Sequence, residues 1–322
     1  DAVKNSLDVL TIGVNGCSPN TLDDPDIRDA DVLIASTDSD EVNMVTCMMA
    51  KNYGVKHTVA RIRNTEYALT AKDLLNQGMN IDLILNPERI TATEINHILM
   101  TPSALDVDDF AEGKVRMFEA RMSDASPYVG VPLKDLEIPK QILIAMLFRR
   151  HKMIIPHGDD MLEPGDNVYF VGQQSAIKEF EETFVNTYEK IERVMIIGAG
   201  RTGRFLAPML EEQGLFVKVI EKNKDRCQLI AQKLENGIVL CGDGTDIDLL
   251  TEEGIAEADV VICITEDDKL NLLLALMAKH LGAKKTIVRV ARNEYVELME
   301  KVGVDIVLSS RLLSSGEVLR FV

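Results

Sequence analysis

Short apolar runs alternate along the chain with longer segments of helix length, at two places far apart in the sequence. Residues 32–35 and 260–264 are apolar runs of strand length, and each precedes a predominantly apolar segment, 42–51 and 269–281 respectively. Continuous apolar runs predict strands that are buried on both faces, as in a parallel sheet. Alternation of strand and helix with short connections therefore predicts a doubly wound α/β fold.

These two regions repeat one another. Residues 31–44, DVLIASTDSDEVNM, align with residues 259–272, DVVICITEDDKLNL, and the same offset carries Arg61 onto Arg289. Self-similarity held at one constant register indicates two copies of the same structural unit. The sequence therefore predicts two domains of the same Rossmann-like architecture.

The residues between the repeats follow a different pattern. Residues 114–122 alternate like a strand, residues 141–149 and 152–156 predict further strands, and residues 175–184 predict a helix. Strands that follow one another without intervening helices indicate a small α+β domain. The predicted organisation is a first Rossmann-like domain at residues 1–103, a small α+β domain at residues 104–186 and a second Rossmann-like domain at residues 187–322.

A glycine-rich turn in the second repeat carries the strongest chemical signal. In residues 191–203, IERVMIIGAGRTG, the three glycines Gly198, Gly200 and Gly203 follow an apolar run and precede a helix. This is the GxGxxG order of a dinucleotide-binding βαβ unit, in which the helix N-terminus faces a pyrophosphate. We predict a phosphate-binding turn here, with Arg201 as either a further phosphate contact or a solvent-exposed arginine.

A second apolar run, residues 215–220, ends in Glu221. A carboxylate at this distance beyond the glycine turn can accept hydrogen bonds from the ribose hydroxyls of a nucleotide. It would repel a 2′-phosphate, which favours NAD(H) or an adenine nucleotide over NADP, although the neighbouring Lys222 weakens this exclusion. The alternative is a solvent-exposed carboxylate at the end of a strand.

Polar residues follow the matched strands of both repeats. Ligands of doubly wound sheets lie at the carboxyl ends of the strands, which is where Thr37, Asp38, Thr265 and Glu266 fall. The two threonines could also cap the following helices, because an aspartate stands three positions after each of them. The matched arginines, at the end of the next strand, could reach a phosphate or a carboxylate at an interface.

The first repeat has no counterpart of residues 194–221. By the register, Asp1 corresponds to Leu229, so the repeat begins inside its unit and has no glycine turn. Its predicted strands would lack their central partner, which an isolated sheet does not tolerate. We therefore expect this chain to be part of a longer protein.

Charge and composition argue against several classes of protein. The formal net charge is −17 and no basic stripe is present, which argues against nucleic-acid binding. No apolar run approaches the ~20 residues that span a bilayer, so we expect no direct membrane insertion and any membrane role to depend on a partner. The five cysteines show neither CxxC nor metal-ligand spacing and are expected to be reduced and mostly buried: Cys17, Cys47, Cys227, Cys241 and Cys263.

Together, these features resemble the RCK (KTN) family of regulatory domains. The resemblance rests on the glycine turn, Glu221, the GDGTD motif of residues 242–246, the matched polar residues after the strands and the tandem domain order. It implies two RCK N domains separated by an RCK C domain, as in the cytoplasmic regulatory subunits of bacterial Trk potassium-uptake systems. No second small domain follows Val322, which departs from the tandem pattern.

The resemblance also implies a function without catalysis. Such subunits form a homo-oligomer, a dimer or a tetrameric ring, at the inner face of the membrane. They gate a TrkH-like potassium transporter subunit according to bound NAD(H) or ATP/ADP. The residues implied to bind the nucleotide are Gly198, Ala199, Gly200, Arg201, Thr202, Gly203, Glu221, Asp243, Thr265, Glu266 and Arg289 in the second repeat, and Thr37, Asp38 and Arg61 in the first.

Two alternatives remain open at this point. One is a nucleotide sensor attached to another cation transporter or antiporter, since nothing in the sequence names the ion. The other is an NAD-dependent dehydrogenase, which would need a proton-relaying residue beside the nicotinamide and a substrate pocket. We expect neither catalytic nor metal-binding residues.

The predicted helix of residues 269–281 has almost no polar face. A surface helix of this kind would expose a large apolar patch, so it must be covered on more than one side. We expect the second side to pack against a neighbouring domain or the matching helix of residues 42–51, and the intact protein to be oligomeric.

Overall fold

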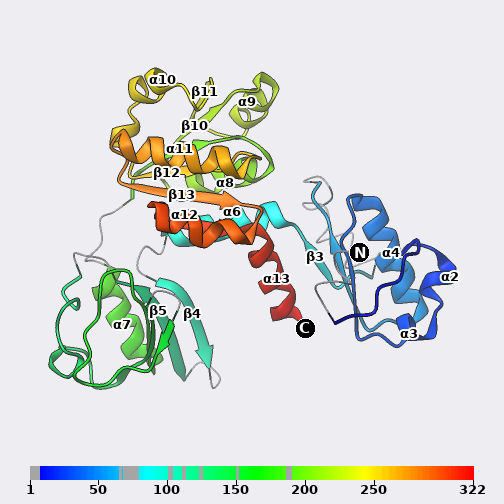
Figure 1. Ribbon diagram of the computed structural model, residues 1–322, viewed down its shortest axis with the longest axis horizontal. Helices are drawn as coiled ribbons and strands as arrows, with labels where there is room; N and C mark the ends of the chain where they lie inside the picture. Colours follow the sequence, from blue (N-terminus) through cyan, green and yellow to red (C-terminus); the bar gives the residue numbers. More distant parts are fainter. Residues whose placement is uncertain are drawn as a thin grey trace.

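The computed structural model describes residues 8–64, 67, 80–100, 104–110, 114–122, 126–149, 152–185 and 191–322. Two parallel sheets with helices and one antiparallel sheet form three separate units (Figure 1). The predicted fold class, two Rossmann-like α/β units separated by a small α+β unit, is confirmed. The predicted domain limits at residues 103 and 186 fall within 101–103 and 186–190, outside the described residues.

The largest sheet belongs to the second repeat and has six parallel strands in the order β11-β10-β9-β12-β13-β14. Its strands are β9 (Arg193–Ile197), β10 (Phe216–Glu221), β11 (Ile238–Cys241), β12 (Val260–Cys263), β13 (Lys285–Val290) and β14 (Ile306–Ser309). The chain winds outward from β9 to β11 and then crosses back to β12 on the other side of β9. Such a reversal of strand order leaves a crevice at the carboxyl ends of the central strands.

Helices cover both faces of this sheet. The alternating residues of β9 enter two different clusters, Val194 and Ile196 on one face and Met195 and Ile197 on the other. This explains why the strand is apolar at successive positions. The first face carries α8 (Arg201–Glu212) and α9 (Lys224–Ala231), and the second carries α10 (Ile247–Glu252), α11 (Asp268–His280) and α12 (Val296–Val302).

The first repeat forms a sheet of three parallel strands with a helix of its own. The strands are β1 (Val32–Ala35), β2 (His57–Arg61) and β3 (Leu83–Leu85), preceded by α2 (Pro19–Leu22) and α3 (Pro25–Arg28) and accompanied by α4 (Asp40–Tyr53). Its core is small and includes Ala35, Cys47 and Ala60.

The repeat extends to polar contacts at the amino ends of the strands. Asp82 accepts hydrogen bonds from the ammonium of Lys51, at 2.7 Å, and the amide of Thr58, at 2.8 Å. The same three groups recur in the second repeat as Asp305, the ammonium of Lys279, at 2.7 Å, and the amide of Thr286, at 2.8 Å. The two units therefore share side-chain geometry as well as strand order.

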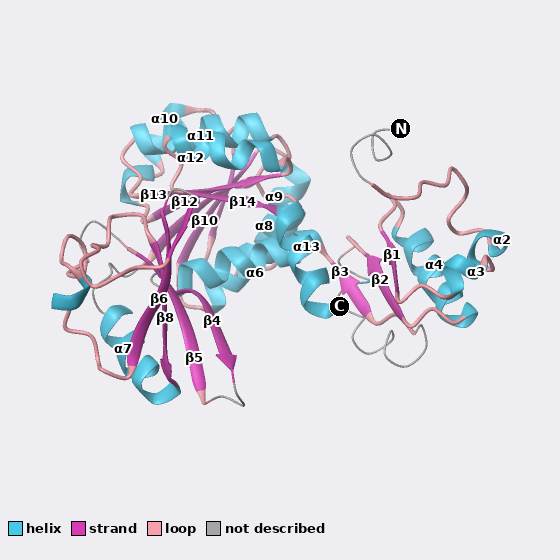
Figure 2. Cartoon of the chain, turned by 60° about the horizontal axis from the view of Figure 1, so that its bottom comes forward, coloured by secondary structure: helices cyan, strands magenta, loops and turns pink. Residues whose placement is uncertain are grey.

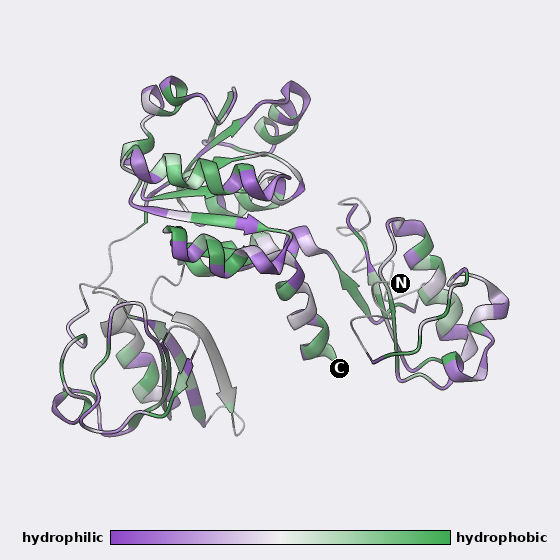
Figure 3. Ribbon diagram, viewed as in Figure 1, coloured by the Kyte–Doolittle hydropathy of each residue, from purple (hydrophilic) through white to green (hydrophobic). Residues whose placement is uncertain are grey.

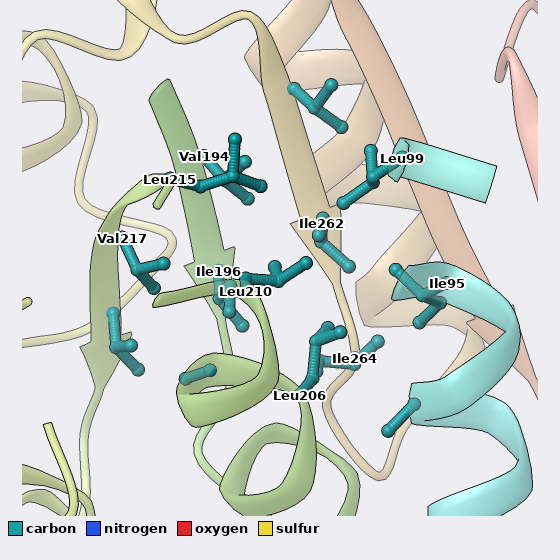
Figure 4. Packing of buried hydrophobic residues seen from close by; sticks show 14 of the residues in the cluster. Ile95, Leu99, Val194, Ile196, Leu206, Leu210, Leu215, Val217, Ile262 and Ile264 are labelled. Carbon is teal, nitrogen blue, oxygen red and sulfur yellow. The ribbon is translucent and has the colours of Figure 1, made fainter. Parts of the chain in front are cut away.

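Helix α6 (Pro87–Met100) does not pack on the sheet that precedes it. The predicted limits of 1–103 place it in the first domain, whereas Ala92, Ile95 and Leu99 enter the cluster of the second domain together with residues of α8 (Figure 4). Sequence order cannot reveal this placement, because an amphipathic helix fits any apolar face within reach. The first sheet and the second repeat are thus joined by a helix that belongs to the second core.

The last helix, α13 (Ser310–Phe321), also lies between the first sheet and the second Rossmann-like unit (Figures 1 and 2). Its chain direction is opposite to that of α6, since it leads from the second unit toward the first. It packs against α6 and reaches β3, and the ring of Phe321 meets that of His57 with centroids 5.7 Å apart. Hydrophobic and hydrophilic residues both occur along this helix (Figure 3), and Leu312 and Leu319 are exposed.

The small domain is an antiparallel sheet with one helix packed on it, in the order β4-β5-β8-β6-β7. Its elements are β4 (Ala104–Phe110), β5 (Val115–Arg121), the short helix η2 (Leu133–Asp135), β6 (Ile142–Arg149), β7 (Lys152–Ile154), β8 (Asn167–Gln173) and α7 (Gln174–Val185). Phe170 lies at the centre of its core, with ring centroids 5.9 Å from Phe118 and 5.1 Å from Phe180. Within the described part of the chain, no helix is long and apolar enough to cross a membrane.

Candidate functional site

A cavity of about 310 Å³ opens at the carboxyl ends of the central strands, where the strand order of the second repeat reverses. This volume lies at the lower end of the range of small-molecule sites, roughly 300–1,000 Å³. Residues from the turns after β9, β10, β11 and β12 line it: Gly198, Gly200, Glu221, Lys222, Asn223, Arg226, Asp243, Gly244, Thr245, Thr265, Glu266 and Asp267, with Ile197, Ile220, Ile264, Leu270 and Leu274 at its apolar base.

The glycine turn has the geometry that its sequence predicts. Gly198 has φ +113°, a conformation that L-residues rarely adopt. A Cβ on Gly203 would lie 2.4 Å from the carbonyl oxygen of Gly198, so only glycine lets α8 pack this closely on the turn. Gly200 is different, because a Cβ there would meet nothing nearer than a guanidinium nitrogen of Arg226, at 3.9 Å. The space above Gly200 is open to a ligand.

The N-terminus of α8 faces this space. Its N-cap is Gly200, which has no side chain to accept a hydrogen bond from the first turn. The first amides of a helix have no partner within the helix and attract anions. Ala199 is already engaged, since its amide donates to Glu221 at 2.8 Å.

Glu221 closes the turn from the side of β10. It is only 6% exposed, and its second carboxylate oxygen accepts from the amide of Asn223 at 2.9 Å. The alternative of a solvent-exposed strand-end carboxylate is therefore wrong. A carboxylate has about four acceptor positions, so two protein donors leave capacity for ribose hydroxyls. Glu221 thus positions the glycine turn and still presents acceptors to the cavity.

Arg226, which the sequence analysis missed, carries a positive charge to the glycine turn. It lies in the first turn of α9, and its guanidinium donates to Glu266 at 3.1 Å across the cavity. The guanidinium also lies beside Gly200, where a pyrophosphate would approach the backbone. In the sequence it was one of several charged residues in a short helix, with no periodicity to single it out.

Asp243 lies on the β11 side of the cavity. Its carboxylate accepts from the amide of Thr245, at 2.9 Å, and from its hydroxyl, at 2.8 Å. These two hydrogen bonds outweigh desolvation and, with the nearby charge of Lys222, hold the pKa of Asp243 below its usual range. The carboxylate therefore stays ionised at neutral pH.

The threonines after the matched strands do not cap the helices. The N-caps of α4 and α11 are Ser39 and Asp267, whose side chains accept from the amides of Val42 and Lys269. The capping alternative for Thr37 and Thr265 is therefore wrong. Each cap lies two residues further along the chain, because the strand first turns before the helix begins.

Each threonine is instead held by an asparagine of the following helix. The hydroxyl of Thr265 donates to Asn271 Oδ1 at 2.6 Å, and Asn271 Nδ2 donates to the carbonyl of Arg289 at 2.9 Å. In the first repeat, Thr37 bonds Asn43 at 2.7 Å and Asn43 bonds the carbonyl of Arg61 at 2.8 Å. Both arginine side chains reach back to the carbonyl of their threonine at 3.4 Å.

Several expected site residues lie outside the cavity of the second repeat. Arg201 lines a different cleft, together with Arg204 and with Asp38 of the first repeat. Ala199, Thr202 and Gly203 build the turn without lining the cavity, and Arg289 lies behind Thr265, to whose carbonyl it donates. The residues that the structure brings together around it are Gly198, Gly200, Glu221, Asp243, Thr265 and Glu266.

Two domain families match this chain. The TrkA-N domain matches residues 1–87 and 194–310, and the TrkA-C domain matches residues 117–185. The order of the matches agrees with the order of the three units in the structure.

Potassium-uptake proteins are similar to the chain along nearly all of its length. The Trk system potassium uptake protein trkA homolog 1 of Methanosarcina mazei is 39% identical over 324 residues, covering 98% of this chain and 79% of the relative. The Trk system potassium uptake protein TrkA of Vibrio alginolyticus is 33% identical over 325 residues, covering 99% of this chain and 71% of the relative.

Solved structures show the same fold. The GsuK channel superposes with a TM-score of 0.74 at 19% identity, over 98% of this chain and 56% of the channel chain. The GsuK channel bound to NAD superposes with a TM-score of 0.72 at 18% identity, again over 98% of this chain and 56% of that chain. The chain thus spans little more than half of either channel chain, and at these identities the likeness concerns the fold alone.

Proposed function

The chain belongs to the TrkA family of Trk-system potassium uptake proteins, and we propose that it is a nucleotide-binding regulatory subunit that gates a membrane potassium transporter. Its place would be in the cytoplasm, at the inner face of the membrane and against a TrkH-like transporter subunit. It would act as a homo-oligomer, a dimer or a tetrameric ring.

The observation that carries the proposal is the cavity at the glycine turn. An open space above Gly200, the N-terminus of α8 and the guanidinium of Arg226 together suit a diphosphate. Acceptors of Glu221 face the same cavity and suit the ribose hydroxyls next to that diphosphate. NAD(H) and ADP or ATP share this ribose-diphosphate part, and both NAD and ADP are bound in structures of the GsuK channel.

Helix α11, which starts beside the cavity, could transmit nucleotide binding to the transporter. Glu266 and Asp267 line the cavity, and α11 begins at Asp268. Its outer residue Leu273 is 51% exposed, although the helix is largely apolar. If another subunit covers this side of α11, a nucleotide that pulls on the turn before it would change the angle between domains.

Titration calorimetry with NADH, NAD, ADP and ATP tests the proposal. Gly200→Asp places a carboxylate where the diphosphate would lie and should abolish binding, whereas the neutral Gly200→Asn has nearly the same size and controls for bulk. Gly200 has φ −65° and open space around a Cβ, so both variants should fold. Equal affinity for NADH in the parent protein and in folded Gly200→Asp would refute the site.

Further measurements test the two alternative functions, an NAD-dependent dehydrogenase and a sensor attached to another transporter. Of the residue types that usually relay a proton in dehydrogenases, histidine, lysine and tyrosine, only Lys222 is among the described residues that line the cavity, so a dehydrogenase is the less favoured alternative. Turnover of NAD with a panel of alcohols and hydroxy acids would overturn the regulatory proposal. Co-purification with membrane proteins from native cells would distinguish a Trk transporter from another cation transporter or antiporter.

A further inference from the structure

Two cysteines that lie 14 positions apart in the sequence, Cys227 of α9 and Cys241 at the end of β11, meet beside the nucleotide cavity. We propose that they form a dithiol modification site, which reacts with low-molecular-weight disulfides to give an intramolecular disulfide. Its effect on nucleotide binding rests on the function proposed above, whereas the formation of the bond does not.

The pleat of the sheet places both thiols in the same layer. In the parallel register of β10 and β11, Val219 pairs with Val239 and Glu221 pairs with Cys241. Val219 and Val239 pack into the cluster that contains Ile230 of α9, so Cys241, two residues after Val239, points to the same face. Cys227 precedes Ile230 by three residues and therefore shares its face of α9.

Contacts agree with this placement. The thiol of Cys227 donates to the carbonyl oxygen of Glu221 at 3.1 Å, which is the residue beside Cys241 in the sheet. The side chain of Cys241 is also among the groups that raise the pKa of Cys227, as expected for two thiols within interaction distance. The two sulfur atoms are therefore neighbours in the folded chain.

The two thiols differ in their exposure. Cys241 is exposed, whereas Cys227 is 7% exposed. Burial is the main cause that raises the pKa of Cys227 to about 12, and the neighbouring side chains of Cys241 and Glu221 add to it. Cys227 therefore stays protonated at neutral pH, and Cys241 is the thiol that meets reagents from solution.

The reaction balances as two thiol–disulfide exchanges. The Cys241 thiolate attacks one sulfur of the external disulfide, forms a mixed disulfide and releases one external thiolate, which takes up a proton. Cys227 then loses its proton to solvent and attacks the sulfur of Cys241, releasing the second external thiol. The two protein thiols are oxidised by two electrons and the external disulfide is reduced to two thiols.

Closure of the bond would alter the cavity. A disulfide has an S–S distance of about 2.05 Å, shorter than any contact between two free thiols, so the start of α9 would move toward β11. The neighbours of the two cysteines, Arg226 and the Gly242–Asp243 turn, line or flank the nucleotide cavity. We expect the dissociation constant for ADP to change by at least about threefold.

The test uses oxidised and reduced glutathione as the probe on the full chain in a Cys17→Ser background, because Cys47 and Cys263 are fully buried. The affinity of the reduced protein for ADP is measured first, which decides the proposed function separately. Mass spectrometry of the native protein should then show the loss of two hydrogen atoms and a Cys227–Cys241 peptide pair. Cys227→Ser should stop the reaction at the glutathione adduct on Cys241, and Cys241→Ser should prevent both products.

Reduction with dithiothreitol should restore the original mass and the original ADP affinity. The site would be refuted if native protein acquired only the glutathione adduct, or if the disulfide formed only after denaturation. An internal disulfide with unchanged ADP affinity, in a protein whose reduced form binds ADP, would refute the coupling to the cavity.

Discussion

The guanidinium of Arg226 lies 3.1 Å from the carboxylate of Glu266, and both residues line the cavity at the glycine turn. Arg226 lies in α9, the helix that follows β10, and Glu266 lies in the turn after β12. The pair therefore links the two sides of the crevice. A diphosphate above Gly200 would offer Arg226 a second anion. The ion pair is therefore expected to exchange partners when a nucleotide binds.

We predict that Arg226→Ala weakens binding of ADP and NADH by about tenfold or more, as expected for the loss of a hydrogen bond to a charged group, about 1.5–3 kcal/mol. Glu266→Gln should have the opposite effect, because it leaves Arg226 free for the phosphates. Calorimetry on both variants measures these changes.

Arg193→Ala is the matched control for that prediction. Arg193 pairs with Glu257 at the amino end of the same sheet and is well exposed, so nucleotide affinity should not change. If Arg226→Ala bound ADP as tightly as the parent protein, Arg226 would have no part in phosphate binding.

We predict that Glu221→Ala weakens NAD and ADP alike, by about 1–3 kcal/mol through the lost ribose contact, and also lowers stability. The second effect arises because the amides of Ala199 and Asn223 would lose their acceptor. Glu221→Gln keeps one carbonyl acceptor and should be intermediate in both respects. A variant that lost stability but kept full affinity for both ligands would restrict Glu221 to positioning the turn.

The site illustrates how far a sequence pattern determines geometry. The glycines and Glu221 could be placed from spacing because the turn connects two adjacent strands, and short connections leave few conformations. Arg226 could not be placed in this way, because its role depends on how the short helix α9 is oriented at the cavity, and nothing in its sequence neighbourhood distinguishes it from other charged residues. Asn271 belongs to the repeated motif, but its bond to Thr265 could not be read from the spacing.

The same limit explains the placement of α6. The alternating strands and helices of the Rossmann-like units followed from the apolar and polar segments, but the sequence of an amphipathic helix does not indicate which sheet it covers. Ile95 is fully buried in the second core, although a stretch of more than ninety residues separates α6 from β9. The proximity of Cys227 and Cys241 could not be predicted from the sequence for a related reason, since it depends on the register of β10 and β11.

We predict that Ile95→Ala destabilises the second Rossmann-like unit, by about 2–5 kcal/mol, because it leaves a cavity against α8. The first sheet, which precedes α6 in the chain, should be much less affected. Hydrogen exchange resolved by peptide would show faster exchange in α8 and β9. Leu319→Ala, at a position that is 77% exposed, serves as the control and should change stability by no more than about 0.5 kcal/mol.

The last prediction concerns the outer side of α11. Leu274, Ala275 and Ala278 pack into the core, whereas Leu273 is 51% exposed. The matching helix α4 has exposed Val42 and Val45, but it lies on the first unit, away from α11 in the same chain (Figure 1). The two apolar helix surfaces are therefore both available to other copies of the chain, which supports an oligomer.

Leu273→Glu should break that association without unfolding the protein, because the side chain already borders solvent. Sedimentation at micromolar concentration should give a dimer or tetramer for the parent protein and a smaller species, or aggregates, for the variant. Leu229→Glu is the matched control, since this half-exposed leucine lies on α9 at the other face of the sheet. A parent protein that stayed monomeric with and without NADH would contradict the ring. It would also contradict the proposed route from nucleotide to transporter, because no second subunit would be present in contact with α11.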